Sequence, residues 1–240
     1  MPDRAALVTG ASSGIGLAIA HLLGEEGHSL TVAARRPEKL EAAAEELRAA
    51  GHEVESVAAN MADEGEIQRV VARHRERFGR LDVLVNSAGV GIGAPLAEIQ
   101  SKRIDMQMDV NLRSIVLFYR ECAALLRAAG GEHRNALVVN VSSLSGKSGQ
   151  PWLSVYSATK AAVIAWTQAM NKELNAEGIK SVALAPGFVD TPMSDFIKEQ
   201  IEPERMITTQ DIAEAVRFVL RTSPNCVVPE IVFQRPGEAL

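Results

Sequence analysis

The chain has 240 residues, of which 47% are apolar and 23% charged, the balance of an ordinary soluble globular protein. Thirty acidic residues against 25 Lys and Arg leave a net charge of −5 without a block of like charges, which argues against nucleic acid or an anionic membrane surface as a partner. With no membrane span, no signal peptide and two cysteines (Cys122, Cys226) without disulfide or metal-ligand spacing, we expect a cytoplasmic protein that binds no metal.

Short apolar runs of strand length alternate with longer amphipathic stretches. Ile15, Ile19 and Leu22 recur at helical spacing, and Pro37 stands where the first residue of a helix belongs. Pro229 lies inside the last strand-like run and predicts an edge position or a bulge there. In chain order we predict strands over 5–9, 29–34, 54–58, 81–86, 137–141, 180–185 and 226–233, with helices over 14–26, 37–50, 64–78, 109–129, 156–177 and 212–220 between them.

Seven strand-like runs separated by helices indicate βαβ units with right-handed crossovers. The predicted fold is therefore α/β, a Rossmann-like doubly wound parallel sheet of about seven strands in a three-layer α/β/α arrangement. The sequence has no internal repeat and no Pro- or Ser-rich linker. We expect a single domain over residues 1–240 that carries both a cofactor site and a substrate site.

A glycine cluster joins the first strand to the first helix. The stretch Thr9-Gly10-Ala11-Ser12-Ser13-Gly14-Ile15-Gly16 has the spacing G-x-x-x-G-x-G rather than the commoner G-x-G-x-x-G. Glycine lets the backbone turn sharply and bring its N–H groups against a pyrophosphate, beside the positive end of the helix. Any tight strand–helix turn uses glycine. The position after the first strand nevertheless favours dinucleotide binding.

Two arginines follow the second predicted strand. Arg35 lies about 20 residues beyond the glycine turn, where an NAD site has an Asp or Glu for the ribose hydroxyls. An arginine there, with Arg36 beside it, suits a ribose that carries a 2′-phosphate. Two solvated surface arginines are the alternative.

Tyr156 and Lys160 are four residues apart at the start of a predicted helix, so both side chains lie on one face. A cation near the phenol favours the phenolate and is expected to lower the tyrosine pKa, as general acid–base catalysis requires. An amphipathic helix with an exposed Lys and a half-buried Tyr is the alternative. Ser143, residues 86–89, Pro186 and Gly187 also follow predicted strands, and parallel strands bring their carboxyl ends to one edge.

With these residues in view, the sequence resembles a short-chain dehydrogenase/reductase of the single-domain type, with TGxxxGxG and YxxxK motifs. The resemblance runs from Thr9 to about Leu220, through TGASSGIG, NSAG, VNL, VSS, YSATK and PGFVDT in order. It implies that Tyr156 exchanges a proton with the carbonyl or alcohol and that Ser143 holds the substrate oxygen. It also implies that Lys160 binds the nicotinamide ribose and lowers the tyrosine pKa, while Asn111 anchors a water in a proton path.

The resemblance also implies the coenzyme site. Gly10, Ser12, Ser13, Ile15 and Gly16 would line the pyrophosphate, Asn86 and Gly89 the adenine-side ribose, and Thr191 the nicotinamide carboxamide. The remaining residues expected to contact NADP(H), preferred over NAD(H), are Arg35, Arg36, Asn60, Met61, Ala88, Pro186, Gly187 and Val189 with Tyr156 and Lys160.

Three positions depart from the family pattern. Asn60 replaces the Asp that contacts the adenine, and Ser87 replaces the second Asn of NNAG. The end of the chain, residues 229–237, lacks the usual glycine-rich close, which bears on the family's tetramer contacts. From the resemblance, and from apolar faces on residues 112–126 and 158–170, we still expect a homodimer or homotetramer.

The expected substrate-binding residues are mainly apolar, which favours a neutral ketone, aldehyde or alcohol: Ser143, Leu144, Gln150, Trp152, Phe188 and Met193. The sequence therefore predicts an NADP-dependent alcohol dehydrogenase or carbonyl reductase. A sugar-nucleotide epimerase or dehydratase shares the Tyr/Lys pair but needs a larger C-terminal substrate region. The non-enzymatic alternative is an NADP-sensing or scaffold protein of the same fold.

Overall fold

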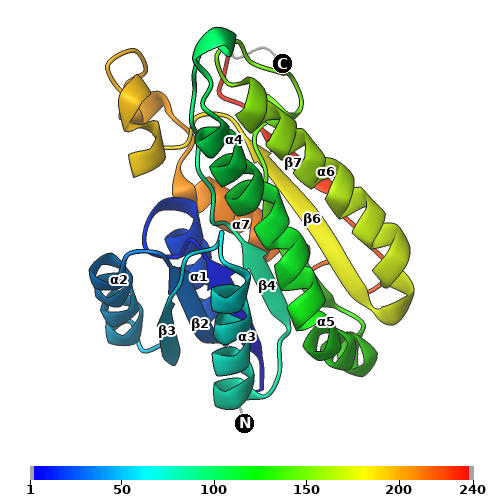
Figure 1. The fold of residues 1–240 in the computed structure, drawn as a ribbon. Coiled ribbons are helices and arrows are strands. Elements are labelled where there is room, and N and C mark those ends of the chain that lie inside the picture. The colour runs from blue at the N-terminus through cyan, green and yellow to red at the C-terminus, as the bar shows by residue number, and fades with distance from the viewer. Residues whose placement is uncertain (1–2, 238–240) are drawn as a thin grey trace.

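The computed structural model describes residues 3–237, whose strands form one seven-stranded sheet in the order β3-β2-β1-β4-β5-β6-β7 (Figure 1). Every neighbouring pair of strands is parallel. The strands are β1 Ala5–Thr9, β2 Ser29–Ala34, β3 Val54–Ala58, β4 Val83–Asn86, β5 Ala136–Val141, β6 Ile179–Pro186 and β7 Glu230–Phe233. The helices are α1 Gly14–Glu25, α2 Pro37–Ala49, α3 Glu64–Phe78, α4 Ser101–Met108, α5 Ser114–His133, α6 Ser154–Leu174 and α7 Thr209–Leu220.

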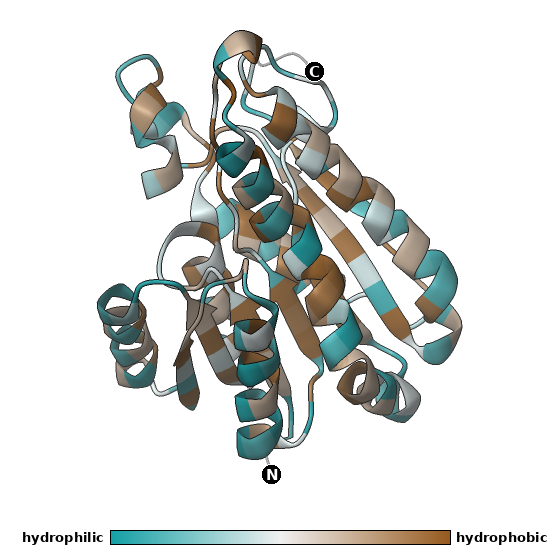
Figure 2. Ribbon diagram, viewed as in Figure 1, coloured by the Kyte–Doolittle hydropathy of each residue, from teal (hydrophilic) through white to brown (hydrophobic). Residues whose placement is uncertain are grey.

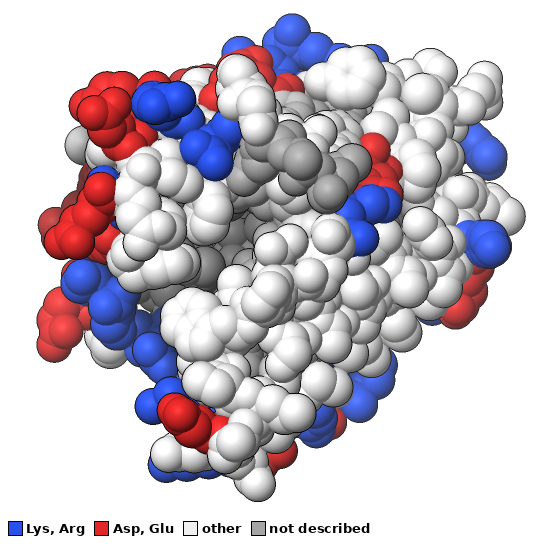
Figure 3. Space-filling model, turned by 90° about the horizontal axis from the view of Figure 1, so that it is seen from above, with Lys and Arg blue, Asp and Glu red and all other residues white. Residues whose placement is uncertain are grey.

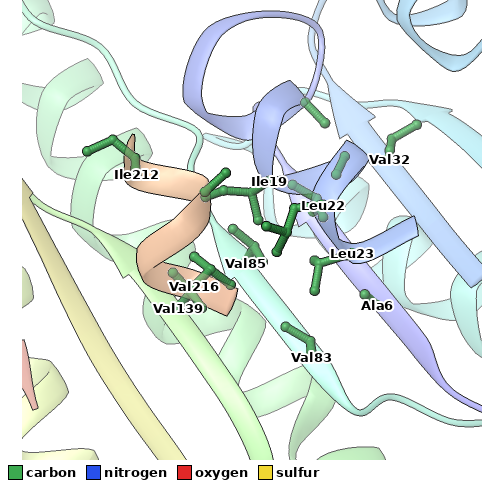
Figure 4. Close-up of a cluster of buried hydrophobic side chains, with 14 of the residues drawn as sticks. Ala6, Ile19, Leu22, Leu23, Val32, Val83, Val85, Val139, Ile212 and Val216 are labelled. Carbon is green, nitrogen blue, oxygen red and sulfur yellow. The ribbon is translucent and has the colours of Figure 1, made fainter. Parts of the chain in front are cut away.

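Alternate residues of the strands face opposite helical layers, so the sheet has two apolar cores. Figure 2 shows the strands as mostly apolar. Val8 and Val85 belong to the core beneath α1 and α7, where Ile19 and Val216 pack (Figure 4). Leu7 and other strand residues of the opposite face pack against α3, α5 and α6. Burial on both faces explains why these strands read as continuous apolar runs.

The predicted Rossmann-like fold class is confirmed. The chain reverses its direction of sheet growth between β1 and β4, and open α/β sheets bind ligands at the carboxyl ends of strands beside such a switch point. The strand predicted over 81–86 begins only at Val83, and Asp82 before it accepts a hydrogen bond from the Ala5 N–H. The strand predicted over 226–233 begins at Glu230. Pro229 precedes it, and β7 is an edge strand, as the proline predicted.

The largest difference from the sequence prediction is the helix expected over 109–129. The structure has α4, a π-helical turn over Asp109–Arg113, and then α5. α4 was missed because Ser101–Met108 is predominantly polar and has one buried residue, Gln107, in place of an apolar stripe. The helix predicted over 156–177 starts two residues earlier, at Ser154, and ends in a 3-10 turn over Asn175–Glu177. Within residues 3–237, no helix combines the length and apolarity needed to cross a membrane.

Candidate active site

The turn between β1 and α1 lies tightly against its neighbours. A Cβ on Gly10 would lie 2.8 Å from the Ala88 nitrogen, and one on Gly16 would lie 2.4 Å from the Gly10 carbonyl oxygen. Gly10 also has φ +68, which favours glycine. The Thr9 hydroxyl accepts hydrogen bonds from the N–H groups of Ser87 and Ala88, both at 3.1 Å. The glycine turn and the loop after β4 therefore form one unit.

The N-terminus of α1 opens at this turn. Its N-cap, Ser13, makes no side-chain capping bond, and the first turn contains no acidic residue. The first N–H groups of a helix have no partners within the helix, so they favour an anion together with the helix dipole. Ser12, Ser13 and Ile15 are half-buried here. The cradle at Gly10 and Gly16 and the uncapped helix end suit a pyrophosphate.

Gly16→Ala is expected to destabilise the protein and to weaken coenzyme binding together. The added Cβ would force Gly10 away from α1, which costs about 1–3 kcal/mol of unfolding free energy as an overpacked site. Urea denaturation and NADPH titration measure the two effects. Gly131→Ala in α5 is the matched control, because a Cβ there meets nothing within 4 Å and removes a helical glycine. Equal stability of the two variants would contradict the assigned packing.

The positions expected to contact the adenosine half lie at the same carboxyl edge. Arg35 and Arg36 are exposed between β2 and α2, and neither guanidinium makes an ion pair or hydrogen bond within residues 3–237. Asn60 is exposed after β3, and its side-chain oxygen accepts a hydrogen bond from the Ala62 N–H at 3.2 Å. An amide oxygen has two lone pairs, so one acceptor site is left for a ligand. Met61 beside it is buried.

Tyr156 and Lys160 lie on one face of α6, as predicted. The Lys160 Nζ is 5.6 Å from the centroid of the Tyr156 ring and donates a 2.8 Å hydrogen bond to the Val141 carbonyl at the end of β5. Lys160 is buried and Tyr156 is half-buried. The lysine is thus fixed to the sheet, next to a tyrosine that is only partly buried.

The pKa values of this pair differ from the sequence expectation. Burial raises the pKa of Tyr156 above its usual value, and a hydrogen bond with Ser143 acts in the opposite direction. Burial lowers the pKa of Lys160 to about 8. Burial thus outweighs the expected lowering of the tyrosine pKa, and with its own pKa at about 8 Lys160 is mostly neutral where a buried phenol loses its proton.

The depressed pKa of Lys160 predicts a pH-dependent stability. Between pH of about 8 and 10.5 the unfolded chain keeps the proton that the folded protein has released, so the free energy of unfolding rises with pH. Removal of this group in Lys160→Met cancels that rise. The unfolding free energy of wild type minus that of the variant is therefore expected to increase by about 2 kcal/mol between pH 7 and 9.5 in urea denaturation. A difference that stays constant would exclude a titrating buried Lys160.

Ser143 stands at the end of β5, facing the start of α6. Its hydroxyl donates to the Pro186 carbonyl at 3.4 Å and accepts from the Ser145 N–H at 3.2 Å, so it also ties β5 to β6. The neighbouring Ser142 hydroxyl donates to the Lys160 carbonyl at 2.8 Å. The two serines therefore fix the distance between the sheet edge and the Tyr/Lys face of α6.

Asn111 lies in the π-helical turn and is fully buried. Its side chain exchanges two hydrogen bonds with the backbone of Val90, at 2.8 and 2.9 Å, and donates to the Thr159 hydroxyl at 3.1 Å. A Cβ on Gly89 would lie 3.5 Å from both the Asn111 Oδ1 and the Lys160 Nζ. Asn111 thus joins the loop after β4 to α6, next to Lys160.

A buried polar chain behind the site was missed by the sequence analysis. The Asn86 amide donates to the Asn140 side chain at 2.9 Å, and the Asn140 amide donates to Tyr119 and Thr167. The Asn86 Oδ1 is buried and has no hydrogen-bond partner among residues 3–237. The signal was present in the sequence, since Asn140 interrupts an apolar strand.

The positions expected to bind substrate and nicotinamide surround the same edge. A Cβ on Gly14 would lie 3.0 Å from the Thr191 side chain, so the loop after β6 reaches the glycine turn. Figure 3, viewed onto the carboxyl ends of the strands, shows a hollow with a mainly uncharged visible rim. Trp152 and Met193 are about half exposed, Gln150 is exposed, and Leu144 is buried at 9%. The other expected residues near this edge are Pro186, Gly187, Phe188 and Val189.

Comparisons with known proteins agree with this geometry. The family model for short chain dehydrogenase matches residues 4–202. An uncharacterized oxidoreductase of Staphylococcus aureus (strain USA300) is 35% identical over 235 residues, 96% of each chain. A 3-oxoacyl-(acyl-carrier-protein) reductase of Staphylococcus aureus (strain Mu50) is 36% identical, covering 98% of this chain and 97% of its own. An actinorhodin polyketide ketoreductase variant, solved with NADPH, has a TM-score of 0.88 at 33% identity, over 98% of this chain and 96% of its own.

Proposed function

Since this chain belongs to the short-chain dehydrogenase family of oxidoreductases, we propose that it interconverts a neutral carbonyl compound and its alcohol with NADP(H). The observation that carries the proposal is the convergence of Tyr156, Lys160, Ser143 and Asn111 at the carboxyl edge of the sheet. A phenol, a buried amine and a serine hydroxyl in one accessible site suit proton exchange with an oxygen atom.

Each group has a distinct part in the proposed reaction. Ser143 donates a hydrogen bond to the substrate oxygen, and the Tyr156 hydroxyl gives that oxygen its proton during reduction or removes it during oxidation. Lys160 orients the ribose that carries the nicotinamide, and Asn111 holds a water in a path for protons. When bound, NADP(H) supplies or accepts the hydride.

The residues at the first turn fit the coenzyme. We propose that the turn between β1 and α1 binds the pyrophosphate. The backbone at Gly10 and Gly16 is packed too closely for a Cβ, and the N-terminus of α1 beside it has no side-chain cap. The proposed contacts are Gly10, Ser12, Ser13, Ile15 and Gly16. Asn86, at the end of β4, is proposed to border the adenine-side ribose. The remaining proposed contacts are Asn60, Met61, Ala88, Gly89, Pro186, Gly187, Val189 and Thr191.

We propose a preference for NADP(H) over NAD(H). A 2′-phosphate requires a cation beyond the end of β2. Arg35 and Arg36 directly follow that strand and are exposed, and neither position is acidic. The solved relatives carry NADPH, NADP or NADH, so the choice depends on this chain's own arginines.

We also propose self-association through α5 and α6. A hollow of about 310 Å³ lies between these helices and is lined mainly by apolar side chains such as Val116, Trp166 and Met170. A homodimer or homotetramer would cover it. Light scattering that shows only a 25.7 kDa species at micromolar concentration would contradict this proposal.

A turnover screen tests the proposed function. Neutral ketones, aldehydes and alcohols are offered with NADPH or NADP⁺, and the absorbance of the reduced nicotinamide is followed. We expect turnover of at least one class, faster with the phosphorylated coenzyme than with NADH or NAD⁺. Tight coenzyme binding without turnover of any compound would favour a sensing or scaffold role.

A further inference from the structure

Three aromatic side chains from two distant segments meet beside the candidate active site. Phe196 is the central ring, with its centroid 6.5 Å from that of Trp152 and 6.4 Å from that of Phe188. Trp152 precedes α6, whereas Phe188 and Phe196 follow β6. Trp152 is 52% and Phe196 60% exposed, although large aromatic residues normally bury their rings.

Trp152 is held in a costly conformation. Its φ of +69 is one of two positive φ values at non-glycine residues within 3–237. A Cβ on Gly93 would lie 2.5 Å from the indole, and the Trp152 carbonyl accepts a 2.9 Å hydrogen bond from the Ala94 N–H. The loop after β4 therefore accommodates the indole only because residue 93 is glycine. Strain of this kind persists where the surroundings over-determine it, and it concentrates at ligand sites.

The same loop connects the rings to the reacting phenol. A Cβ on Gly91 would lie 3.7 Å from the Tyr156 ring, two residues before the contact of Gly93 with Trp152. The exposed indole and the phenol thus border one short stretch of backbone. A molecule with its oxygen at Tyr156 would extend along this loop toward Trp152 and Phe196.

The charges near the rings are already engaged. The Arg235 guanidinium lies 5.8 Å from the centroid of Phe188, and the Lys198 ammonium is 2.8 Å from carboxylate oxygens of both Asp190 and Asp195. Because these charged groups already have partners, the exposed faces of Trp152 and Phe196 suit an uncharged ligand.

We infer that Trp152 and Phe196 form an aromatic clamp that selects an uncharged ketone or alcohol carrying an aryl ring. This inference rests on the proposed function and adds the substrate class to it. The ligand ring would pack against the exposed indole and phenyl faces, which aromatic pairs favour in offset or edge-to-face arrangements.

The kinetic test compares acetophenone with butanone, each reduced with NADPH by wild type and variants. Phe196→Ala is expected to lower kcat/KM for acetophenone by about tenfold and that for butanone by less than about twofold. The intrinsic reactivity of each ketone cancels in these ratios. Trp152→Asn should act alike without added strain, since Asn tolerates a positive φ. Phe218→Ala, from an equally exposed ring on α7, is the control and should change neither ratio.

A binding test separates this inference from the proposed function. In Trp166→Phe, Trp152 is the single remaining tryptophan. We expect acetophenone to quench its fluorescence saturably in the presence of NADP⁺, where no reduction can occur, and Phe196→Ala to weaken this binding. Quenching without turnover would overturn the proposed function alone. Three results would overturn the clamp. The first is an equal loss of kcat/KM for both ketones in Phe196→Ala, and the second is an absence of quenching by acetophenone. The third is Trp152 emission that changes with protein concentration and not with acetophenone, since a second copy of the chain would then cover the indole.

Discussion

Replacing Tyr156 by Phe is expected to lower kcat by about 10²–10⁴-fold, the usual contribution of general acid–base catalysis. Phe keeps the ring that packs near Gly91 and beneath the Lys160 ammonium, so NADPH affinity should stay within a few-fold of wild type. Only the hydroxyl that exchanges a proton with the substrate is removed. Steady-state kinetics and coenzyme titration measure the two effects separately.

The second tyrosine of the chain is the matched control. The buried Tyr119 hydroxyl donates to Ser181 and accepts from Asn140, away from the Tyr/Lys face of α6. Tyr119→Phe removes these hydrogen bonds and should lower the unfolding free energy by about 1–3 kcal/mol, with kcat within a few-fold of wild type. Near-normal kcat in Tyr156→Phe would exclude the phenol as the proton-transfer group.

Arg35→Asp is expected to lower kcat/KM for NADPH by at least about tenfold and to narrow or reverse the preference over NADH. A charge-assisted hydrogen bond contributes about 1.5–3 kcal/mol, and tenfold in affinity corresponds to about 1.4 kcal/mol. The guanidinium makes no competing ion pair within the described residues, so its charge is available to a 2′-phosphate. Exposure and screening keep the expected effect at the lower end.

Lys39→Asp controls for long-range electrostatics. It makes the same change of charge in the first turns of α2, at an exposed residue to which we assign no contact. A long-range effect of charge would lower kcat/KM for NADPH equally in both variants. A direct contact with the 2′-phosphate would lower it only in Arg35→Asp. A wild type that prefers NADH, or an Arg35→Asp variant with unchanged preference, would show Arg35 to be a solvated surface residue.

The sheet and the first turn could be predicted from the sequence because they depend on residues close together in the chain. β1 and β2 are buried along their whole length, and strands buried on both faces appear in the sequence as nearly continuous apolar runs. The backbone passes so close to Gly10 and Gly16 that only glycine fits, and this requirement appears in the sequence as the G-x-x-x-G-x-G spacing. The pairing of Tyr156 with Lys160 follows from helical periodicity alone.

Features that depend on tertiary contacts could not be predicted from the sequence. The π-helical turn around Asn111 exists where its side chain binds the Val90 backbone, a partner that no local pattern indicates. The pKa of Tyr156 depends on burial and on the hydrogen bond with Ser143, neither of which follows from its spacing from Lys160. Trp152 reads as an apolar loop residue until its positive φ and its contact with Gly93 are seen.

We propose above all that this chain transfers a hydride to a neutral carbonyl group, with Tyr156 as the proton donor. The most direct measurement supplies NADPH with deuterium at the transferable position to a panel of neutral ketones and analyses the products by mass spectrometry. We expect an alcohol with one deuterium on the former carbonyl carbon for wild type, and a loss of about 10²-fold or more in its rate of formation for Tyr156→Phe. Bound NADPH with no deuterated alcohol from any ketone, or equal rates in the two proteins, would contradict the account.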